Sequence, residues 1–563
     1  MFIEKNNCRI FYSIKNTAKD YLEKLCDSWD IYDKQRFFVN AVSVYDRLFM
    51  DLYTNSDKTT EQPLNYRILD FSYPVFINTF YDCDFQNLPG VVLKPIDEKL
   101  LKLYSKILYS CGIIGWMQSL IDEVNSGYVS YYSLGNYVEM RFNHKYHWNE
   151  YLEKEYILWY SKIIAEFHKS KYEELNKKFP EINNIMKSQV FVWMDSFIGY
   201  SNDKEVEEYF SELALLDAQE ATEWDMFPQD CKFGNLYYRD IVQTIVDFAG
   251  YSIKHTYFSI ILKSEKPDLI YENLLINITT EDDLIKLIRE NVFISVNECK
   301  NLLNTISLTN DNKIYYLNAK AARAPLIKIS NKQYIRSISG FLDRPFEFML
   351  NNLLKMFPKD WSKSTNQREF VFRKQLYDFF DDDKYMCVDR PVIIKDKTGK
   401  IITDIDALVI DKITHQIALF QLKWQDHTDD SAFILKSKME NYNNKTEKWV
   451  DDVYNWLNSS PTEEIARQLN VKRKYVEKDK IFMFVIGRRH GNYSANEKPE
   501  SNCAWSQWYQ VMQISTYLKQ NNMFSISDMY QHLKWMHPSN RKIIERKTVF
   551  KYDKYRIHIG GII

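Results

Sequence analysis

Two short runs of alternating residues, joined by one polar turn, constrain the fold of this chain more than any other feature. In residues 418–424, ALFQLKW, alternation places Gln421 and Lys423 on one face of a strand and only apolar side chains on the other. Residues 403–410, TDIDALVI, alternate in the same way. The intervening residues 411–416, DKITHQ, are polar at both ends, as turns are. The pattern predicts a β-hairpin.

The length of the turn determines which residues face each other. If the turn is centred midway through residues 411–416, antiparallel pairing sets Asp406 opposite Gln421 and Asp404 opposite Lys423, with Cβ atoms roughly 5 Å apart. A carboxylate, an amide and an ammonium group would then converge on one face. Because the rest of the strand pair is apolar, this cluster of three polar groups predicts a functional site.

These residues resemble the PD-(D/E)XK nuclease superfamily, in the variant with Gln in the last motif that is found in Mrr-like restriction endonucleases. Asp406 matches the acidic residue of the first motif, and Gln421-Leu422-Lys423 matches the last triplet. Ile405 stands where the superfamily often has Pro. The resemblance covers only part of the C-terminal half. It implies a restriction-endonuclease-like α/β domain, with a central mixed sheet flanked by helices.

The resemblance implies a metal-dependent endonuclease that hydrolyses phosphodiester bonds in nucleic acid, with DNA as the expected polymer. Hard cations such as Mg²⁺ take oxygen ligands, and the implied ligands are Asp406, the amide oxygen of Gln421 and the backbone carbonyl of Leu422. Lys423 would orient the attacking water and offset phosphate charge. Because Gln421 is neutral, we expect weak binding that needs more than micromolar Mg²⁺, or Mn²⁺ in its place.

The superfamily usually adds an acidic residue on the helix before the sheet, and Glu369 is the candidate. Residues 364–380 begin with Ser and Thr, which cap helices, and continue with apolar residues at helical spacing. Two alternatives stay open. Glu369 can be an ordinary first-turn residue favoured by the helix dipole, and Asp404 can replace Asp406 as the metal ligand.

The remaining elements around the hairpin follow from apolar patterning. We expect a strand near residues 385–395 before the hairpin, then a helix at about 431–457, a strand at 481–486 and a helix at about 504–518. The resulting order is α-β-β-β-α-β, which the family resemblance identifies as the core order of its fold.

Charge is distributed unevenly along a nearly neutral chain of 74 basic and 76 acidic residues. Residues 331–563 hold 38 basic and 29 acidic side chains, whereas residues 1–330 hold 36 and 47. The C-terminal half therefore suits a polyanion. The candidate phosphate contacts are Arg488 and Arg489, directly after the last core strand, and Lys472, Arg473 and Lys474. A solvated charged loop is the alternative for both groups.

The first 330 residues form a second unit in this interpretation. Long amphipathic stretches predict a mostly helical sensor, regulatory or assembly region, with strands at 2–14 and 128–142. We expect its connection to the nuclease-like domain (331–563) at about 313–338, and a basic extension at the C-terminal end of that domain. Its acidic character favours a protein partner or a homo-oligomer. The chain as a whole is expected to be an α+β multidomain protein.

Several function classes are disfavoured by what the sequence lacks. The eight cysteines form no C-x-x-C pair, which argues against a zinc ribbon and a disulfide framework. No secretory signal and no long apolar run is found, so we expect a cytoplasmic protein without a membrane partner. Defence against phage or foreign DNA is the expected role, by family analogy. The rivals are a catalytically silent nuclease fold that binds nucleic acid or assembles complexes, and a structural scaffold.

Overall fold

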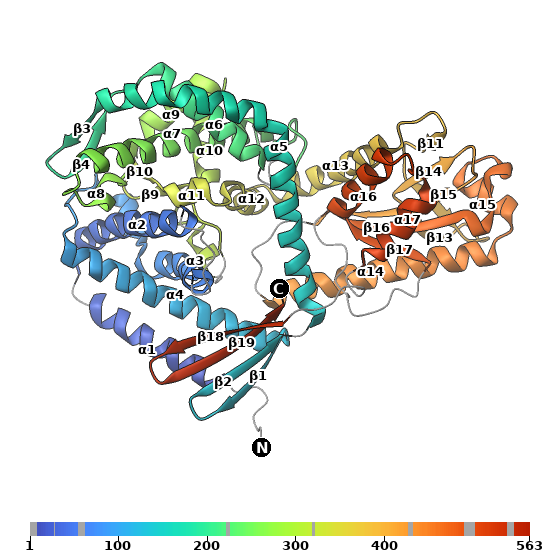
Figure 1. Ribbon diagram of the computed structural model, residues 1–563, viewed down its shortest axis with the longest axis horizontal. Coiled ribbons are helices and arrows are strands. Elements are labelled where there is room, and N and C mark those ends of the chain that lie inside the picture. Colours follow the sequence, from blue (N-terminus) through green and yellow to red (C-terminus); the bar gives the residue numbers. More distant parts are fainter. Residues whose placement is uncertain are drawn as a thin grey trace.

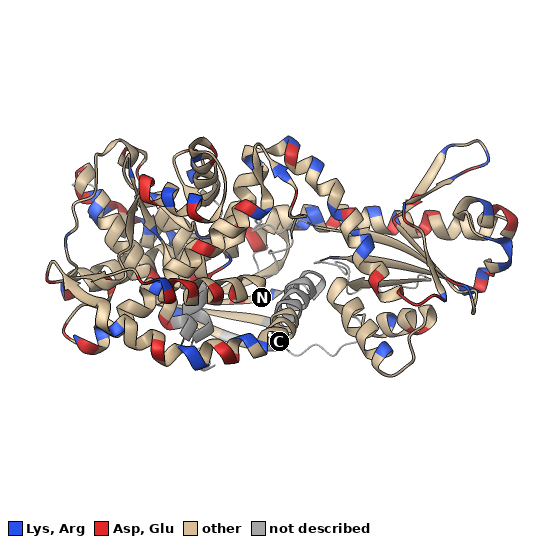
Figure 2. Ribbon diagram, turned by 90° about the horizontal axis from the view of Figure 1, so that it is seen from above, with Lys and Arg blue, Asp and Glu red and all other residues tan. Residues whose placement is uncertain are grey.

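The computed structural model describes most of the chain as two lobes that lie end to end along the long axis (Figures 1 and 2). The described residues are 8–26, 29–54, 62–142, 144–220, 226–317, 321–425, 432–488, 502–537 and 545–562. A mainly helical lobe precedes a lobe with a mixed sheet flanked by helices. The expected α+β multidomain class is confirmed. No described helix combines the length and apolar character that a bilayer crossing requires.

The N-terminal lobe is built from helices packed around two large apolar cores and a smaller one. Its helices are α1 (Arg9–Cys26), α2 (Ile31–Thr54), α3 (Gln62–Phe80), α4 (Glu98–Ser126), α5 (His144–Gln189), α6 (Lys204–Glu220), α7 (Tyr238–Glu265), α8 (Tyr271–Leu274), α9 (Glu281–Asn291), α10 (Val296–Ile306), α11 (Ile338–Leu342) and α12 (Pro345–Met356), with 3₁₀ turns η1 (Cys83–Asn87) and η2 (Lys313–Leu317).

Short strands connect these helices. They are β7 (Ile278–Thr280), β10 (Gln333–Arg336), β9 (Leu326–Lys328) and β8 (Ser307–Leu308), in that sheet order, and the hairpins β3–β4 (Val190–Trp193, Phe197–Tyr200) and β5–β6 (Lys232–Phe233, Leu236–Tyr237). The segment 313–338, expected to connect two domains, instead supplies β9 and β10 to this sheet. The division expected at residue 330 therefore falls inside the N-terminal lobe.

The start of the described chain is helical, so the strand expected at 2–14 is wrong for residues 9–14, and residues 2–7 lie outside the described residues. Phe11, Ile14, Ala18 and Leu22 are buried at three- to four-residue spacing along α1. That spacing forms one apolar stripe, which is buried against α4 only if the segment is a helix.

The last described residues complete a sheet of the N-terminal lobe. Strands β18 (Glu545–Tyr552) and β19 (Tyr555–Ile562) form a hairpin, and β19 runs parallel to β2 (Tyr137–Phe142), which pairs with β1 (Val129–Leu134). The sheet order is β1-β2-β19-β18. The basic extension expected beyond the nuclease-like domain thus lies on the other lobe (Figure 1).

The C-terminal lobe is centred on a five-stranded sheet of order β11-β14-β15-β16-β17, antiparallel on one side of β15 and parallel on the other. The strands are β11 (Tyr385–Cys387), β14 (Ala407–Asp411), β15 (Ile417–Lys423), β16 (Ile481–Gly487) and β17 (Cys503–Gln507), and a separate pair is formed by β12 (Val392–Lys395) and β13 (Ile401–Ile405). The helical elements are α13 (Pro358–Tyr377), α14 (Ala432–Ser459), α15 (Thr462–Leu469), α16 (Trp508–Gln520) and α17 (Ile526–Trp535), with the 3₁₀ turns η3 (Asp378–Phe380), η4 (Arg473–Tyr475) and η5 (Lys478–Lys480).

Helices cover both faces of this sheet, which explains why β15 and β16 are apolar on both sides. Alternate residues such as Phe420 pack with α13, α16 and α17 in one core, and Leu419 packs with α14 in another. The expected order of elements is present, with three differences in detail. The strand near 385–395 is two strands, the strand at 403–410 is interrupted at Asp406, and β17 precedes the helix expected at 504.

Helices α13 and α14 connect the two lobes (Figure 1). The first half of α13 contacts the N-terminal lobe, where Asp360 accepts a hydrogen bond from the Gly234 backbone N–H (2.8 Å). The first turns of α14 do the same, since Lys436 donates to the Ser126 carbonyl (3.0 Å). The far halves of both helices pack on the sheet, so each helix belongs to both lobes.

Candidate active site

The turn between β14 and β15 has the register that the sequence predicts. Asp411 Oδ1 accepts hydrogen bonds from the backbone N–H groups of Ile413 and Thr414 (2.8 and 2.9 Å), and His415 adopts a left-handed conformation with φ of 59°. This side-chain-to-backbone turn closes the hairpin without a bulge. The pairing of Ala407 with Phe420 continues directly to Asp406 opposite Gln421.

The carboxylate of Asp406 lies at the end of this hairpin and is buried, with 6% of the residue exposed. Its Oδ2 accepts a hydrogen bond from the amide Nε2 of Gln421 and another from the backbone N–H of Leu422 (2.7 Å). Gln421 is also buried. The two positions predicted to face each other are therefore in direct contact.

The charge of Asp406 is costly at this position. Burial raises the pKa of Asp406 to about 6, against an ordinary value of 3.8. The Lys423 ammonium and the Leu422 N–H act against that rise, while Asp404 and Glu369 add to it by repulsion. All four groups therefore lie within electrostatic reach of one carboxylate. A buried carboxyl group with a perturbed pKa is typical of functional sites.

Helix α13 holds the backbone of the hairpin at this point. The Arg373 guanidinium donates through Nε to the carbonyl of Asp406. Tyr377 donates its hydroxyl hydrogen to the Val388 carbonyl (2.7 Å), and its oxygen accepts the backbone N–H of Leu408 (3.1 Å). The helix that carries the candidate acid is thus bonded to the strands that carry Asp406.

Glu369 lies in the fourth turn of this helix and its side chain is exposed. The helix begins at Pro358, with Pro at the first position, and not at Ser364 as the capping pattern suggested. Proline is well suited to that position because its missing N–H is unneeded there. The alternative in which Glu369 is a first-turn residue favoured by the helix dipole is therefore wrong.

Asp404 does not face Lys423, contrary to the predicted register. The chain leaves the hairpin before Asp406, and β13 pairs with β12 so that Asp404 is opposite Ile393. Trp449 Nε1 donates to the carbonyl of Asp404 (2.6 Å), which holds the strand beneath α14. The carboxylate of Asp404 is exposed and acts on Asp406 only through its charge.

Arg488 is adjacent to the candidate site but directed inward. Its backbone N–H donates to the carbonyl of Lys423 (2.7 Å). Its guanidinium lies 4.7 Å from the ring centre of Trp424 and 5.4 Å from that of Trp508, and it donates to Gln375 Oε1 (2.8 Å). Only 7% of the residue is exposed. This arrangement favours a packing role over the predicted phosphate contact. Arg489 lies outside the described residues.

We expect Arg488→Met to lower stability without changing the salt dependence of DNA binding. Loss of the cation–π contacts and of one charged hydrogen bond should cost roughly 2 kcal/mol in the free energy of unfolding. A phosphate contact would instead contribute about one unit to the slope of log affinity against log salt. Urea unfolding and a salt titration of DNA binding separate the two. A slope reduced by one unit would contradict the packing role.

The basic cluster at Lys472, Arg473 and Lys474 lies at the opposite end of the sheet. Lys472 precedes η4, and Arg473 and Lys474 belong to it. This turn lies next to the start of β15, where the rings of Tyr475 and His415 are 5.4 Å apart. The strand rise puts this end roughly 20 Å from Lys423. Arg473 is also paired with a carboxylate, that of Glu463 (3.0 Å). The structure does not bring this cluster to the candidate site.

Two glutamines that sequence reasoning missed lie at the same end of the sheet as Lys423. Gln507 ends β17 opposite Gly487, which in turn pairs with Lys423. Gln510 Oε1 accepts the Gln507 backbone N–H (2.9 Å), and both residues are buried. The Nε2 group of Gln510 has no hydrogen-bond partner within the described residues. The sequence feature that could have identified them is a pair of glutamines three residues apart at the end of a strand.

The oxygen atoms of Asp406 and Gln421 are of the kind that a hard divalent cation binds, but they do not form a complete set of ligands in this conformation. Among the described residues, no three His, Cys, Asp or Glu side chains are close enough together to hold a metal ion. Asp406 offers a carboxylate whose charge lacks full compensation. Gln421, however, turns its amide N–H and not its oxygen toward that carboxylate. The amide of Gln421 would have to rotate for its oxygen to become a ligand.

The structure therefore gathers Asp406, Gln421 and Lys423, with Glu369 at the edge, and leaves the predicted basic cluster elsewhere. The carboxyl ends of the parallel strands β15 and β16 form this edge, which is where ligands bind in many α/β sheets. Comparison of the chain with protein-family models, with curated proteins and with solved structures found no match.

Proposed function

We propose that the C-terminal lobe is a metal-dependent endonuclease that hydrolyses phosphodiester bonds in nucleic acid, with DNA as the first polymer to test. The observation that supports it best is the buried Asp406 carboxylate, whose pKa is raised to about 6 beside the Lys423 ammonium. A carboxylate buried without a bonded cation is unfavourable. Binding of a divalent cation would relieve that cost.

A bound Mg²⁺ or Mn²⁺ would supply a polarised phosphate and a water of lowered pKa. Asp406 would hold the ion, with the Gln421 amide oxygen and the Leu422 carbonyl as further ligands. Lys423 would position the phosphate and offset the charge that develops on it. Glu369, exposed at the edge, would act as the outer acid. This division of roles follows from the resemblance to the PD-(D/E)XK superfamily, and a role in prokaryotic defence rests on the same analogy.

One observation favours a second candidate, a catalytically silent lobe that binds nucleic acid or assembles complexes. Gln421 is neutral and already bonded through its N–H to Asp406. In a lobe without catalytic activity, this hydrogen bond would serve to hold the two buried side chains in place. Lys423 argues for activity, since its half-buried residue carries an ammonium within electrostatic reach of Asp406, where it could also offset the charge of a bound phosphate.

The test is a cleavage assay with plasmid, linear duplex, single-stranded DNA and RNA, each with Mg²⁺, Mn²⁺ or a chelator. We expect Lys423→Ala to lower the rate by roughly 10²- to 10³-fold, because a charge that stabilises the transition state is lost. Lys412→Ala is the matched control, since this exposed lysine lies at the other end of the hairpin. Equal rates for the two variants would reject the site. DNA binding without cleavage by the parent protein would favour the silent lobe.

We expect the rate of cleavage to rise with pH through about 6. Asp406 must be ionised to hold a cation, and its pKa is raised to about 6 by burial. Below that value the rate should fall about tenfold per pH unit, and above it the rate should level. The free energy of unfolding of the metal-free protein should show the opposite trend. Because the pKa of Asp406 is higher in the folded than in the unfolded protein, its contribution to stability is fully present below the unfolded pKa. That contribution is lost as pH rises through about 6.

Rates and urea unfolding between pH 4.5 and 8 measure both trends, with metal at saturating and at limiting concentration. Saturating metal should shift the midpoint of the rate profile to lower pH, because the cation competes with the proton. A midpoint near 4 at limiting metal would contradict the assignment to Asp406.

A further inference from the structure

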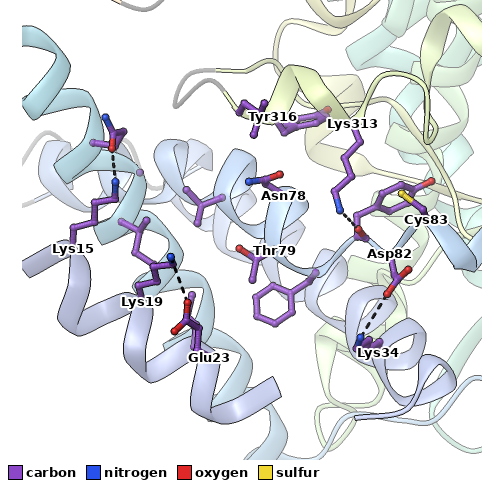
Figure 3. Close-up of a pocket in the computed structure, with 18 of the residues that line it drawn as sticks. Lys15, Lys19, Glu23, Lys34, Asn78, Thr79, Asp82, Cys83, Lys313 and Tyr316 are labelled. Atoms are coloured by element: carbon purple, nitrogen blue, oxygen red, sulfur yellow. Dashed lines mark hydrogen bonds and ion pairs between the residues drawn. The ribbon is translucent and has the colours of Figure 1, made fainter. Parts of the chain in front are cut away.

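A large cavity lies in the N-terminal lobe between α1, α3, α4 and η2 (Figure 3). Its volume is about 870 Å³. Cavities that bind small molecules are typically about 300–1,000 Å³. The proposed nuclease chemistry uses none of the residues that line it. The cavity therefore needs an explanation of its own.

Lysines dominate the charge of this cavity. Lys15 and Lys19 extend from α1 on one side, and Lys34 and Lys313 lie on the other (Figure 3). Among the described residues, the carboxylates that line it are those of Glu23 and Asp82. This excess of positive charge is the reverse of the surrounding half of the chain, which holds 36 basic and 47 acidic residues over 1–330. A locally basic cavity in an acidic half attracts small anions.

Within the part of the chain that the structure describes, two of the four ammonium groups donate to neutral acceptors and make no ion pair. Lys15 donates to the amide oxygen of Gln118, and Lys313 donates to the backbone carbonyl of Tyr81. Lys19 and Lys34, by contrast, pair with the lining carboxylates at 3.4 and 3.6 Å. The positive charges of Lys15 and Lys313 are therefore the ones that an anion could pair with directly.

The environment of Lys15 makes its charge costly. Burial lowers the pKa of Lys15, and the nearby carboxylate of Asp122 acts in the opposite direction. Asp122 itself accepts a hydrogen bond from Gln118 (2.8 Å), so it reaches Lys15 through that amide and not by a direct bond. An anion bound beside Lys15 would add a countercharge in direct contact with the ammonium group.

The remaining wall offers apolar rings beside exposed polar groups. Trp29 is only half-buried and packs on Phe37, with ring centres 4.7 Å apart. Asn78 and Thr79 project from the end of α3 at the middle of the view in Figure 3, and both are exposed. Within the described residues neither side chain makes a hydrogen bond. A ring, hydroxyl groups and an anionic tail could all find contacts here.

We propose that this cavity binds a small phosphorylated ligand of the nucleotide class. Lys15 and Lys313 would pair with phosphate oxygens, Trp29 would contact the base, and Asn78 and Thr79 would hydrogen-bond the sugar or base edge. Lysine suits this role as a compact charge with three donors. The site is separate from Asp406 and does not depend on the proposed nuclease activity.

The test uses the full chain and isothermal titration calorimetry with ATP, GTP, adenosine, inorganic tripolyphosphate and a short oligonucleotide. We expect at least one nucleotide to bind, with the nucleoside and tripolyphosphate each at least tenfold weaker, since each provides only half of the contacts. If tripolyphosphate bound as tightly as the nucleotide, the site would be a general anion site and the proposal of a nucleotide ligand would be wrong. Tight binding of the oligonucleotide alone would replace the small ligand by a polymer.

The variants locate the site. The double substitution Lys15→Gln with Lys313→Gln should weaken nucleotide binding by tenfold or more. Lys99→Gln with Lys102→Gln removes the same charge from exposed positions of α4 outside the cavity and should leave affinity unchanged. Should the first pair unfold the lobe, Asn78→Asp adds a repelling carboxylate at an exposed position and should also weaken binding. Absence of nucleotide binding at millimolar concentration, or equal affinities for all variants, would overturn the proposal.

Asp406→Ala separates this site from the nuclease. It should bind nucleotide with the affinity of the parent chain even if cleavage is lost. A failure of nucleotide binding would leave the proposed nuclease intact, and a failure of cleavage would leave the cavity intact.

Discussion

Asp406→Asn is expected to slow cleavage strongly while leaving the protein at least as stable as the parent. Loss of the buried carboxylate that contacts Gln421 and Leu422 should lower the rate by roughly 10³-fold, which raises the activation free energy by about 4 kcal/mol. The asparagine oxygen can still accept the Leu422 N–H. The fold of the hairpin should therefore persist.

Stability distinguishes this result from simple unfolding. At pH 8 the parent protein carries an ionised carboxylate at a buried position that raises its pKa to about 6. A neutral amide removes that unfavourable charge, so the metal-free variant should unfold at equal or higher urea concentration than the parent. Added Mg²⁺ should stabilise the parent and not the variant. Cleavage retained by Asp406→Asn, or a marked loss of stability, would contradict the assigned role.

Phe550→Ala is expected to destabilise the N-terminal lobe by about 3–5 kcal/mol, although residue 550 is remote from it in sequence. Phe550 is 4% exposed and its ring meets that of Trp116 at 4.6 Å, edge to face. Removing it leaves a cavity between the β18–β19 hairpin and α4. Urea unfolding followed by tryptophan fluorescence measures the loss.

Val549→Ala is the matched control for this experiment. It is the adjacent residue of the same strand, points to the other face and is 44% exposed. We expect it to cost less than about 1 kcal/mol. Similar losses for the two variants would show that the hairpin does not pack on the N-terminal lobe as described.

Local pattern was sufficient to predict the centre of the candidate site. The polar turn at 411–416 is centred between Ile413 and Thr414, so counting outward from it placed Asp406 opposite Gln421. The same count failed for Asp404. The predicted pairing of Asp404 with Lys423 requires one continuous strand over residues 403–410. The strand is instead interrupted at Asp406, where Arg373 of α13 and Trp449 of α14 bond to the backbone. Such contacts cannot be predicted from the local pattern.

Long-range contacts explain the other differences. Arg488 and the cluster at Lys472 are equally basic in sequence, but one is buried by Trp424 and Trp508 and the other is placed at the far end of β16. The sequence predicts a helix from about residue 504 where β17 lies, because Ala504 and Trp505 fit a strand and a helix equally well. Pairing of β19 with β2 joins segments more than 400 residues apart in the numbering. Nothing local to either strand indicates its partner.

Helix α13 gives the molecule a mechanical connection between its halves. Asp360 is bonded to Gly234 of the N-terminal lobe, Arg373 is bonded to the backbone of Asp406, and Glu369 lies between them. A helix of this length is a stiff rod of about 30 Å. Its first turn is therefore held by the N-terminal lobe and its later turns by the hairpin that carries Asp406. A rotation of one lobe against the other would have to bend this helix or break one of those two hydrogen bonds. The position of Glu369 at the candidate site thus depends on contacts made by the lobe that contributes none of the candidate ligands.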